Sequence, residues 1–236
     1  MDITPVIDRI WMLRFPVGQA YALRLADAGW ALVDTGLPGY ADEILDALGS
    51  LGAAPEDLRD IVLTHAHFDH TGSAAGLAAA TGARVLAGAA DAPVVRGDAP
   101  GPEPVLRDWE IPVFEAVHAH ANLPLPHAAP PCPVDVELAD GDTLDWGEEA
   151  RVVHVPGHTP GSIALHLPSS GVLFTGDTIA NVQQLMPGVF NLDQEKTLAS
   201  FRRQAELDVE TACFGHGDPI VGGAGAALRA VVLEPA

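Results

Sequence analysis

The chain has 236 residues, 48% hydrophobic and 19% charged, which is enough to bury the core of one large domain. Its 32 acidic residues exceed its 12 lysines and arginines, and the net charge of −20 disfavours nucleic acids and anionic membranes as partners. There is no membrane-length hydrophobic run, no secretory leader pattern and only two isolated cysteines, Cys132 and Cys213, so we expect a cytoplasmic protein.

The first ninety residues predict a β-rich block with two helices. Short hydrophobic, β-branched or aromatic runs broken by glycine, proline or aspartate are typical of strands. Residues 41–51 carry isoleucine and leucine at helical spacing, and an alanine-rich run over 71–81 predicts a second helix. The predicted strands are 9–15, 20–26, 30–34, 61–64 and 84–87.

A proline-rich stretch interrupts this pattern. Nine of the chain's twenty prolines lie within residues 100–133, which forbids regular structure over most of the stretch. The exception is 108–121, where apolar side chains recur at four-residue intervals, and we predict a helix there with Pro112 near its first turn. We interpret residues 98–133 as an insertion or cap on a single domain spanning residues 1–236.

Strands return after this stretch. They alternate with two helices, predicted at 197–207 and 224–233, so the whole chain is expected to form an α/β fold around one core. The predicted strands of this second block are 134–138, 151–155, 163–167, 172–175 and 211–214.

Residues 64–72, with the sequence THAHFDHTG, are the first candidate functional segment. They follow a predicted strand and precede a predicted helix. His65 and His67 are two positions apart, so both rings point to one side of an extended chain and can share a cation. Asp69 and His70 come where the chain turns into the helix and can aim at a neighbouring point. This density of metal-binding side chains indicates a metal site.

Three later residues have the same character. His158 lies in a glycine- and proline-rich turn, Asp177 follows a hydrophobic strand, and His216 follows another strand. Glycines flank each of them, which lets backbones approach closely. Imidazole and carboxylate ligands suit zinc, iron or manganese better than calcium or magnesium. We therefore expect the four segments to build one shared site.

The order of these motifs resembles that of the metallo-β-lactamase-fold hydrolases, which include glyoxalase II and many bacterial lactonases. The resemblance extends from the VDTG sequence at 33–36 to His216 and leaves the proline-rich stretch open. It implies a four-layer αββα sandwich, in which helices flank two central mixed β-sheets. It also implies two divalent transition metal ions, zinc first, with iron or manganese as alternatives.

Carried over residue by residue, the resemblance assigns a ligand set. Asp34 matches a position that braces the ligand loop, although an aspartate before Gly36 is equally typical of a turn. The implied ligands are His65, His67 and His158 for the first ion and Asp69, His70 and His216 for the second, with Asp177 bridging both.

The implied reaction is hydrolysis. A hydroxide shared by the two ions would attack an acyl carbon or a phosphorus centre, because bound metal lowers the pKa of water to about 7. Asp69 is the expected catalytic residue, orienting the hydroxide and passing a proton to the leaving group. The apolar content of residues 109–125 and 181–188 favours a small neutral ester, thioester or lactone as the substrate.

Several departures narrow the field. The bridging Asp177 and the lack of a leader count against β-lactamase activity. Only twenty residues follow His216, whereas glyoxalase II carries a C-terminal helical domain that binds glutathione, so glutathione thioesters are not expected. Ala180 stands where acyl-homoserine lactonases carry tyrosine, and a lactonase is therefore unsupported. Nucleases of this fold need an added nucleic-acid-binding element and a favourable charge, and neither is evident in this sequence.

Two alternatives to a hydrolase remain. One is a persulfide dioxygenase with a single iron held by His65, His158 and Asp177; the other is a metal-binding module without catalysis. Association of identical chains stays open. The other five histidines are expected to be structural or exposed: His118, His120, His127, His154 and His166. His118 and His120 would form a further metal pair only if their segment were extended.

Overall fold

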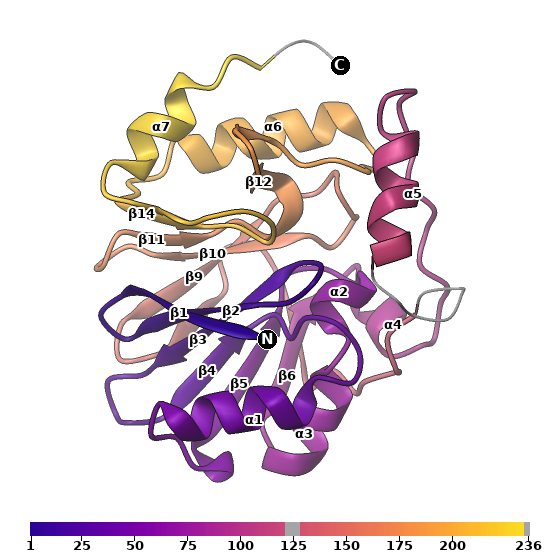
Figure 1. The fold of residues 1–236 in the computed structure, drawn as a ribbon. Coiled ribbons are helices and arrows are strands. Elements are labelled where there is room, and N and C mark those ends of the chain that lie inside the picture. Colours follow the sequence, from indigo (N-terminus) through magenta and orange to yellow (C-terminus); the bar gives the residue numbers. More distant parts are fainter. Residues whose placement is uncertain (121–127, 234–236) are drawn as a thin grey trace.

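The computed structural model describes residues 1–120 and 128–233, which fold into four layers (Figure 1). Two β-sheets lie face to face. Helices α1 (Ala41–Ser50) and α3 (Ala74–Thr81) cover the outer face of one sheet, and α6 (Gln194–Ala205) and α7 (Ala224–Ala230) cover the other. The αββα sandwich expected from the sequence is confirmed.

The first sheet contains seven strands in chain order. Its first four strands pair antiparallel, and the remaining pairs are parallel, so the sheet is mixed. The strands are β1 (Asp2–Ile7), β2 (Ile10–Arg14), β3 (Gln19–Arg24), β4 (Trp30–Val33), β5 (Leu58–Leu63), β6 (Arg84–Gly88) and β7 (Val136–Leu138).

The second sheet has six strands in the order β15-β14-β11-β10-β9-β8, and only β11 and β14 run parallel. A separate hairpin, β12–β13, stands beside it. These strands are β8 (Thr143–Asp145), β9 (Glu149–His154), β10 (Ile163–Leu167), β11 (Val172–Phe174), β12 (Ile179–Asn181), β13 (Leu185–Pro187), β14 (Thr211–Cys213) and β15 (Ile220–Val221).

The shorter helices belong to the connections. Helices α2 (Phe68–Thr71) and α4 (Ala92–Val95) follow β5 and β6, and α5 (Ile111–His120) forms in the proline-rich stretch. The helix predicted at 108–121 is thus confirmed, with Pro112 in its first turn, where a missing N–H costs nothing. The helix expected over 71–81 is divided into α2 and α3 by Gly72 and Ser73.

The main core lies between the two sheets. Apolar side chains from the inner faces of both interdigitate there, among them Leu23 and Val62 of the first sheet and Leu165 and Phe174 of the second. Two further clusters hold the helices onto the outer faces. Strand β5 contributes to both faces of its sheet, which explains the unbroken apolar run of residues 61–63 at its end.

A buried carboxylate, Asp60, ties the two sheets together away from the candidate site. Arg84 donates to it from the neighbouring strand through Nε (2.9 Å) and Nη2 (2.7 Å). Trp146, in the turn between β8 and β9, donates its indole N–H from the other sheet at 2.9 Å. Asp60 is only 1% exposed, so these three bonds offset the cost of its burial.

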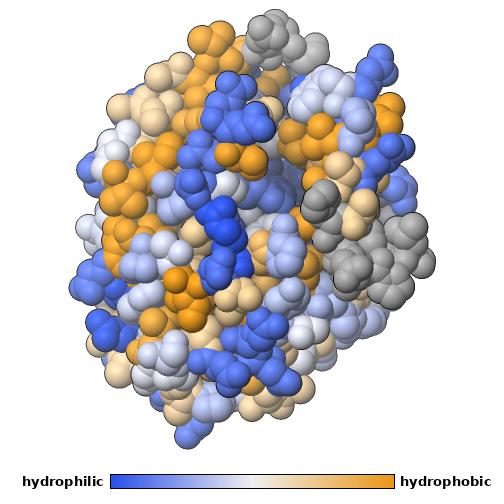
Figure 2. Space-filling model, in the orientation of Figure 1, coloured by the Kyte–Doolittle hydropathy of each residue, from blue (hydrophilic) through white to orange (hydrophobic). Residues whose placement is uncertain are grey.

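No helix in residues 1–120 and 128–233 is long and apolar enough to cross a membrane. On the face seen in Figure 2, hydrophobic and hydrophilic residues are interspersed.

Replacing Asp60 with alanine should destabilise the protein by about 1–3 kcal/mol, because the buried indole N–H of Trp146 would lose its acceptor. Urea unfolding monitored by tryptophan fluorescence measures the change. Asp27→Ala, which removes an exposed ion pair with Arg59, is the control and should leave the midpoint nearly unchanged. Equal midpoints for the two variants would contradict the proposed tie.

Candidate metal centre

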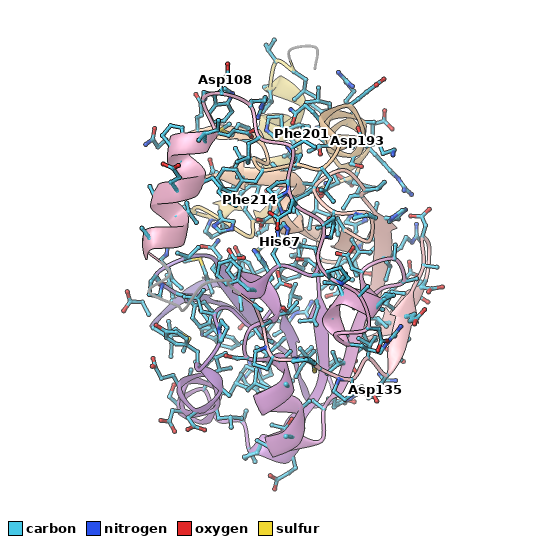
Figure 3. All side chains as sticks on the ribbon, turned by 90° about the vertical axis from the view of Figure 1, so that its right-hand side faces the viewer. His67, Asp108, Asp135, Asp193, Phe201 and Phe214 are labelled. Carbon is cyan, nitrogen blue, oxygen red and sulfur yellow. The ribbon has the colours of Figure 1, made fainter. Side chains whose placement is uncertain are left out.

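The structure brings together all seven ligand candidates from the sequence. They stand at the carboxyl ends of strands of both sheets: four follow β5, and His158, Asp177 and His216 follow β9, β11 and β14. Figure 3 shows His67 at mid-height, between the two halves of the sandwich. Strand ends from both sheets meet at one edge, so residues up to 151 positions apart in the chain become neighbours.

Three histidines form the first group, named here the three-histidine group: His65, His67 and His158. The Nε2 atom of His65 lies 3.1 Å from Nδ1 of His67, and Nε2 of His158 lies 2.9 Å from the same Nδ1. His65 and His158 are nearly fully buried. Three ring nitrogens therefore point at one small volume.

The second group, named here the Asp69 group, contains Asp69, His70 and His216. Oδ2 of Asp69 lies 3.7 Å from Nε2 of His70 and 3.4 Å from Nε2 of His216. Within each group, the candidate ligand atoms lie within 4.8 Å of one another.

Asp177 stands between the two groups. Its Oδ2 is 3.6 Å from Nε2 of His158 in one group and 3.1 Å from Nε2 of His216 in the other, while Oδ1 is 3.4 Å from Nε2 of His70. One carboxylate thus faces both groups, the arrangement required of a bridging ligand.

Two glycines allow this crowding. A Cβ on Gly215 would collide with Oδ1 of Asp177 and lie 2.9 Å from Cε1 of His70. Gly18, in the β2–β3 turn at φ +71°, leaves room beside Asp69 and His216, because a Cβ there would lie 3.1 Å from the Asp69 carbonyl oxygen. Larger side chains at either position would push the cluster apart.

Asp34 orients two of the candidate ligands. Its Oδ2 accepts from Nδ1 of His70 at 2.9 Å and from the Thr64 hydroxyl at 2.8 Å, and its Oδ1 accepts from the Thr64 N–H at 2.7 Å. The Thr64 hydroxyl in turn lies 3.0 Å from Nδ1 of His65. Between the two roles left open by the sequence, bracing and turn formation, these contacts support bracing. The φ of +63° at Asp34 adds a turn-like conformation.

Sequence reasoning missed three other buried polar residues that hold the ligand loops. Asn191 places its Oδ1 3.3 Å from Nδ1 of His158 and anchors itself through Nδ2 to the Gly188 carbonyl at 2.6 Å. Asp91 and Gln19 contact the backbone of other ligand loops. None has a characteristic spacing, so the sequence held no signal for them.

The two groups differ in their proton affinities. Burial lowers the pKa of all three members of the three-histidine group, to about 4 for His158, so these rings are neutral and able to bind metal at pH 7. Burial opposes protonation of His216 as well, but the Asp177 carboxylate outweighs it and raises the pKa of His216 to about 10. Burial also opposes ionisation of Asp69, yet His70 and His216 hold its pKa below the usual value.

The ring nitrogens of the three-histidine group are arranged for binding a metal rather than for hydrogen bonds to one another. The Thr64 hydroxyl proton is used on Asp34, so Nδ1 of His65 carries a proton and its Nε2 is a lone pair; the bond to Asn191 implies the same for His158. Both lone pairs face Nδ1 of His67, whose single proton cannot serve both. Nitrogens bound to one tetrahedral zinc at roughly 2.1 Å would stand roughly 3.4 Å apart, close to these spacings.

Two further atoms support the fit. Nε2 of His70 and Oδ1 of Asp177 are buried without a hydrogen-bond partner among the described residues. Buried polar atoms are normally satisfied, and a cation at the Asp69 group would satisfy both.

The remaining histidines lie apart from this cluster. His154 places Nε2 2.9 Å from the Pro160 carbonyl, and His166 places Nε2 3.1 Å from the Asp208 carbonyl, so both have structural partners. His118 and His120 fall on helix α5, but their side chains, like residue His127, lie outside the described part of the chain.

A family model supplies the decisive comparison. Residues 13–216 match the model described as "Metallo-beta-lactamase superfamily", a range that contains every candidate ligand. The chain belongs to the metallo-beta-lactamase superfamily. This confirms the family resemblance drawn from the sequence motifs.

Named relatives in this superfamily include hydroxyacylglutathione hydrolases. That of Cereibacter sphaeroides strain ATCC 17023 is 35% identical over 198 residues, covering 83% of this chain and 62% of the relative. That of Fuscovulum blasticum is 36% identical over 202 residues, covering 84% of this chain and 61% of the relative. This chain therefore spans about three fifths of the length of these enzymes.

Solved structures show the same fold. A metallo-beta-lactamase family protein from Thermus thermophilus superposes with a TM-score of 0.70 at 24% identity, covering 95% of this chain and 78% of the other. A subclass B3 metallo-beta-lactamase of Bradyrhizobium japonicum gives a TM-score of 0.68 at 24% identity, covering 91% and 77% of the two chains.

The metal-free protein, prepared with a chelator, should be most stable near pH 6.5, the ordinary pKa of histidine being about 6.5. Stability should fall as the pH drops towards about 4, because the unfolded chain then takes up a proton that buried His158 refuses. It should also fall as the pH rises towards about 10, where folded His216 loses the proton that stabilises it. Thermal unfolding by circular dichroism tests both limbs, and His216→Gln should flatten the alkaline one. A melting temperature that rises steadily across this range would contradict the charge assignment.

Proposed function

We propose that this chain is a hydrolase that depends on two divalent transition metal ions, zinc being the first candidate. The observation that carries the proposal is the convergence of five imidazoles and two carboxylates, with two buried atoms left unsatisfied. The three-histidine group would hold one ion, the Asp69 group the other, and Asp177 would join both. Bound there, the ions would polarise a substrate carbonyl and lower the pKa of coordinated water from about 15.7 to about 7.

Asp69 is the proposed catalytic residue. Its carboxylate stands 3.4 Å from Nε2 of His216 and 3.7 Å from Nε2 of His70, and these rings keep its pKa below the usual value. It is therefore ionised at neutral pH, and one of its Oδ atoms can accept a proton from the attacking water. Returned to the leaving group, that proton would complete the cleavage of an acyl bond.

We assign the substrate to the small esters, thioesters and lactones, with thioesters first. The hydroxyacylglutathione hydrolases cited above carry thioester chemistry in their names and share 35% and 36% of the aligned residues with this chain. A "probable metallo-hydrolase" of Bacillus subtilis, 25% identical, covers 89% of this chain and 84% of its own length without narrowing the substrate. Hydrolysis is the chemistry common to these names, and the hydroxyacylglutathione hydrolases add an acyl bond.

The cap segment supports a partly apolar substrate. The Val105 N–H donates to the Asn191 carbonyl at 3.1 Å, and Glu110 accepts from the Phe190 N–H at 3.1 Å, so the cap is fastened to the loop that orients His158. Trp109, at 47% exposure, lies just before α5, whose outer surface mixes hydrophobic and hydrophilic residues (Figure 2). The exposed apolar side chains of Trp109, Ile111 and Val113 suit an acyl group better than a charged group.

The relatives do not favour a mononuclear iron dioxygenase, because the names cited above are those of hydrolases. A dioxygenase would use three of the seven side chains and leave four without a role: His67, Asp69, His70 and His216. A metal-binding module without catalysis would use Asp69 only as a ligand, and the hydrolase names cited above do not favour it.

The protein purified without chelator should contain about two zinc ions per chain, or zinc with a second transition metal, measured by elemental analysis. It should hydrolyse at least one member of a panel of acyl-thioesters, esters and lactones, and chelation should abolish the turnover until metal is restored. A single iron with oxygen consumption on persulfides would overturn the proposal in favour of the dioxygenase. Two bound ions with no turnover on any panel member would leave the metal-binding module as the better description.

Asp69→Asn should lower kcat by about 10²- to 10⁴-fold, the usual size of an acid–base contribution. The amide keeps the shape of the side chain but cannot accept the proton. Metal content is measured on the same preparation, and the role requires that the loss exceed any loss of metal. Full turnover at unchanged metal content would remove Asp69 from the mechanism.

A further inference from the structure

Two buried polar side chains outside the ligand set contact the loops that carry it. Asp91 lies between β6 and α4, and Gln19 is the first residue of β3; each is 2% exposed. Neither contacts a ligand side chain in the described structure, and the proposed hydrolysis gives neither a role. Their hydrogen bonds go to two different ligand loops.

Asp91 joins the two loops of the three-histidine group. Its Oδ2 accepts from the Ala66 N–H at 2.9 Å, between His65 and His67, and from the Thr159 hydroxyl at 2.6 Å, next to His158. Its Oδ1 accepts from the Gly161 N–H at 2.7 Å.

The contact depends on close approach of the two loops. A Cβ on Gly161 would collide with the Asp91 backbone, so this position leaves no space for adjustment. The single carboxylate thereby fixes the separation between a loop of the first sheet and a loop of the second. Removing it would leave two backbone donors, the N–H groups of Ala66 and Gly161, without an acceptor.

Gln19 holds the loop of His216 from both sides. Its Nε2 donates to the Phe214 carbonyl at 2.8 Å and to the Gly217 carbonyl at 2.5 Å, which lie before and after His216. The Tyr21 hydroxyl donates to the same Phe214 carbonyl at 2.8 Å. The turn that presents His216 is therefore clamped by one amide group and supported by one phenol.

We propose that Asp91 and Gln19 are positioning residues that set the affinities of the two metal positions separately, Asp91 for the three-histidine group and Gln19 for the Asp69 group. This inference rests on the proposed two-metal function. Residues that hold metal ligands from behind commonly change metal affinity by about 10- to 100-fold when replaced. The bonds of Asp91 lie beside the ligands of the three-histidine group, and those of Gln19 lie beside His216, so each replacement should act mainly on the position whose ligands it adjoins.

The test is an optical titration with Co²⁺ in two backgrounds that isolate the positions. His216→Ala retains the three-histidine group, and His158→Ala retains the Asp69 group. In the His216→Ala background, Asp91→Asn should raise the Co²⁺ dissociation constant by about 10- to 100-fold, and Gln19→Met should leave it unchanged. In the His158→Ala background the effects should be reversed.

Matched controls separate positioning from loss of stability. Asp60→Asn makes the same substitution at a buried carboxylate remote from the cluster, and Gln204→Met replaces a buried glutamine whose side chain has no hydrogen bond among the described residues. Both should leave the Co²⁺ constants unchanged even where they lower the melting temperature. Thr159→Val and Tyr21→Phe each remove a hydroxyl that supports one of these contacts, and they provide milder versions if a primary variant fails to fold.

The outcomes distinguish this inference from the function on which it rests. Wild-type protein that takes up fewer than two Co²⁺ ions would overturn both. Uptake of two ions with equal effects of Asp91→Asn and Gln19→Met in both backgrounds, or with no effect of either, would overturn the positioning roles alone.

Discussion

Burying the carboxylate of Asp34 removes a charge from water, a cost offset only by the hydrogen bonds it accepts from His70 and Thr64. Those bonds determine which nitrogen of His70, and through the Thr64 hydroxyl which nitrogen of His65, faces the cluster. An imidazole without such a partner can rotate or change tautomer, and its lone pair then points elsewhere. The rest of the centre is built on these two fixed rings.

The geometry of the cluster also depends on the sandwich as a whole. The three-histidine group takes two members from a loop after β5 in the first sheet and one from a loop after β9 in the second. The spacing between the ring nitrogens of this group is thus set by the packing of the two sheets, whose inner faces interdigitate. A shift of one sheet relative to the other would change the separation of the ring nitrogens directly, whereas a change in the surface loops would not.

Local patterns in the sequence predicted most strands and helices and the ligand candidates, whereas the αββα sandwich was implied by the family resemblance of the motifs. The end of β5, residues 61–63, is a hydrophobic run, and the HxHxDH spacing after it is visible without any knowledge of the fold. Strand β1 was missed since it is an exposed edge strand containing Pro5, and the β12–β13 hairpin since its residues have no alternating pattern. Asp91 and Gln19 were missed for a different reason: their partners lie up to 198 positions away, and a single buried polar residue carries no spacing to detect.

Gly215 and helix α5 differ most in the amino-acid substitutions that they can tolerate during evolution. At Gly215 even a methyl group would collide with Asp177, so glycine is the one residue that this position accepts as long as the cluster is kept. Helix α5 is exposed along most of its described length, and Glu110 and Phe114 are among the residues that fasten it to the body. Relatives should therefore differ around helix α5 more readily than around the ligand cluster.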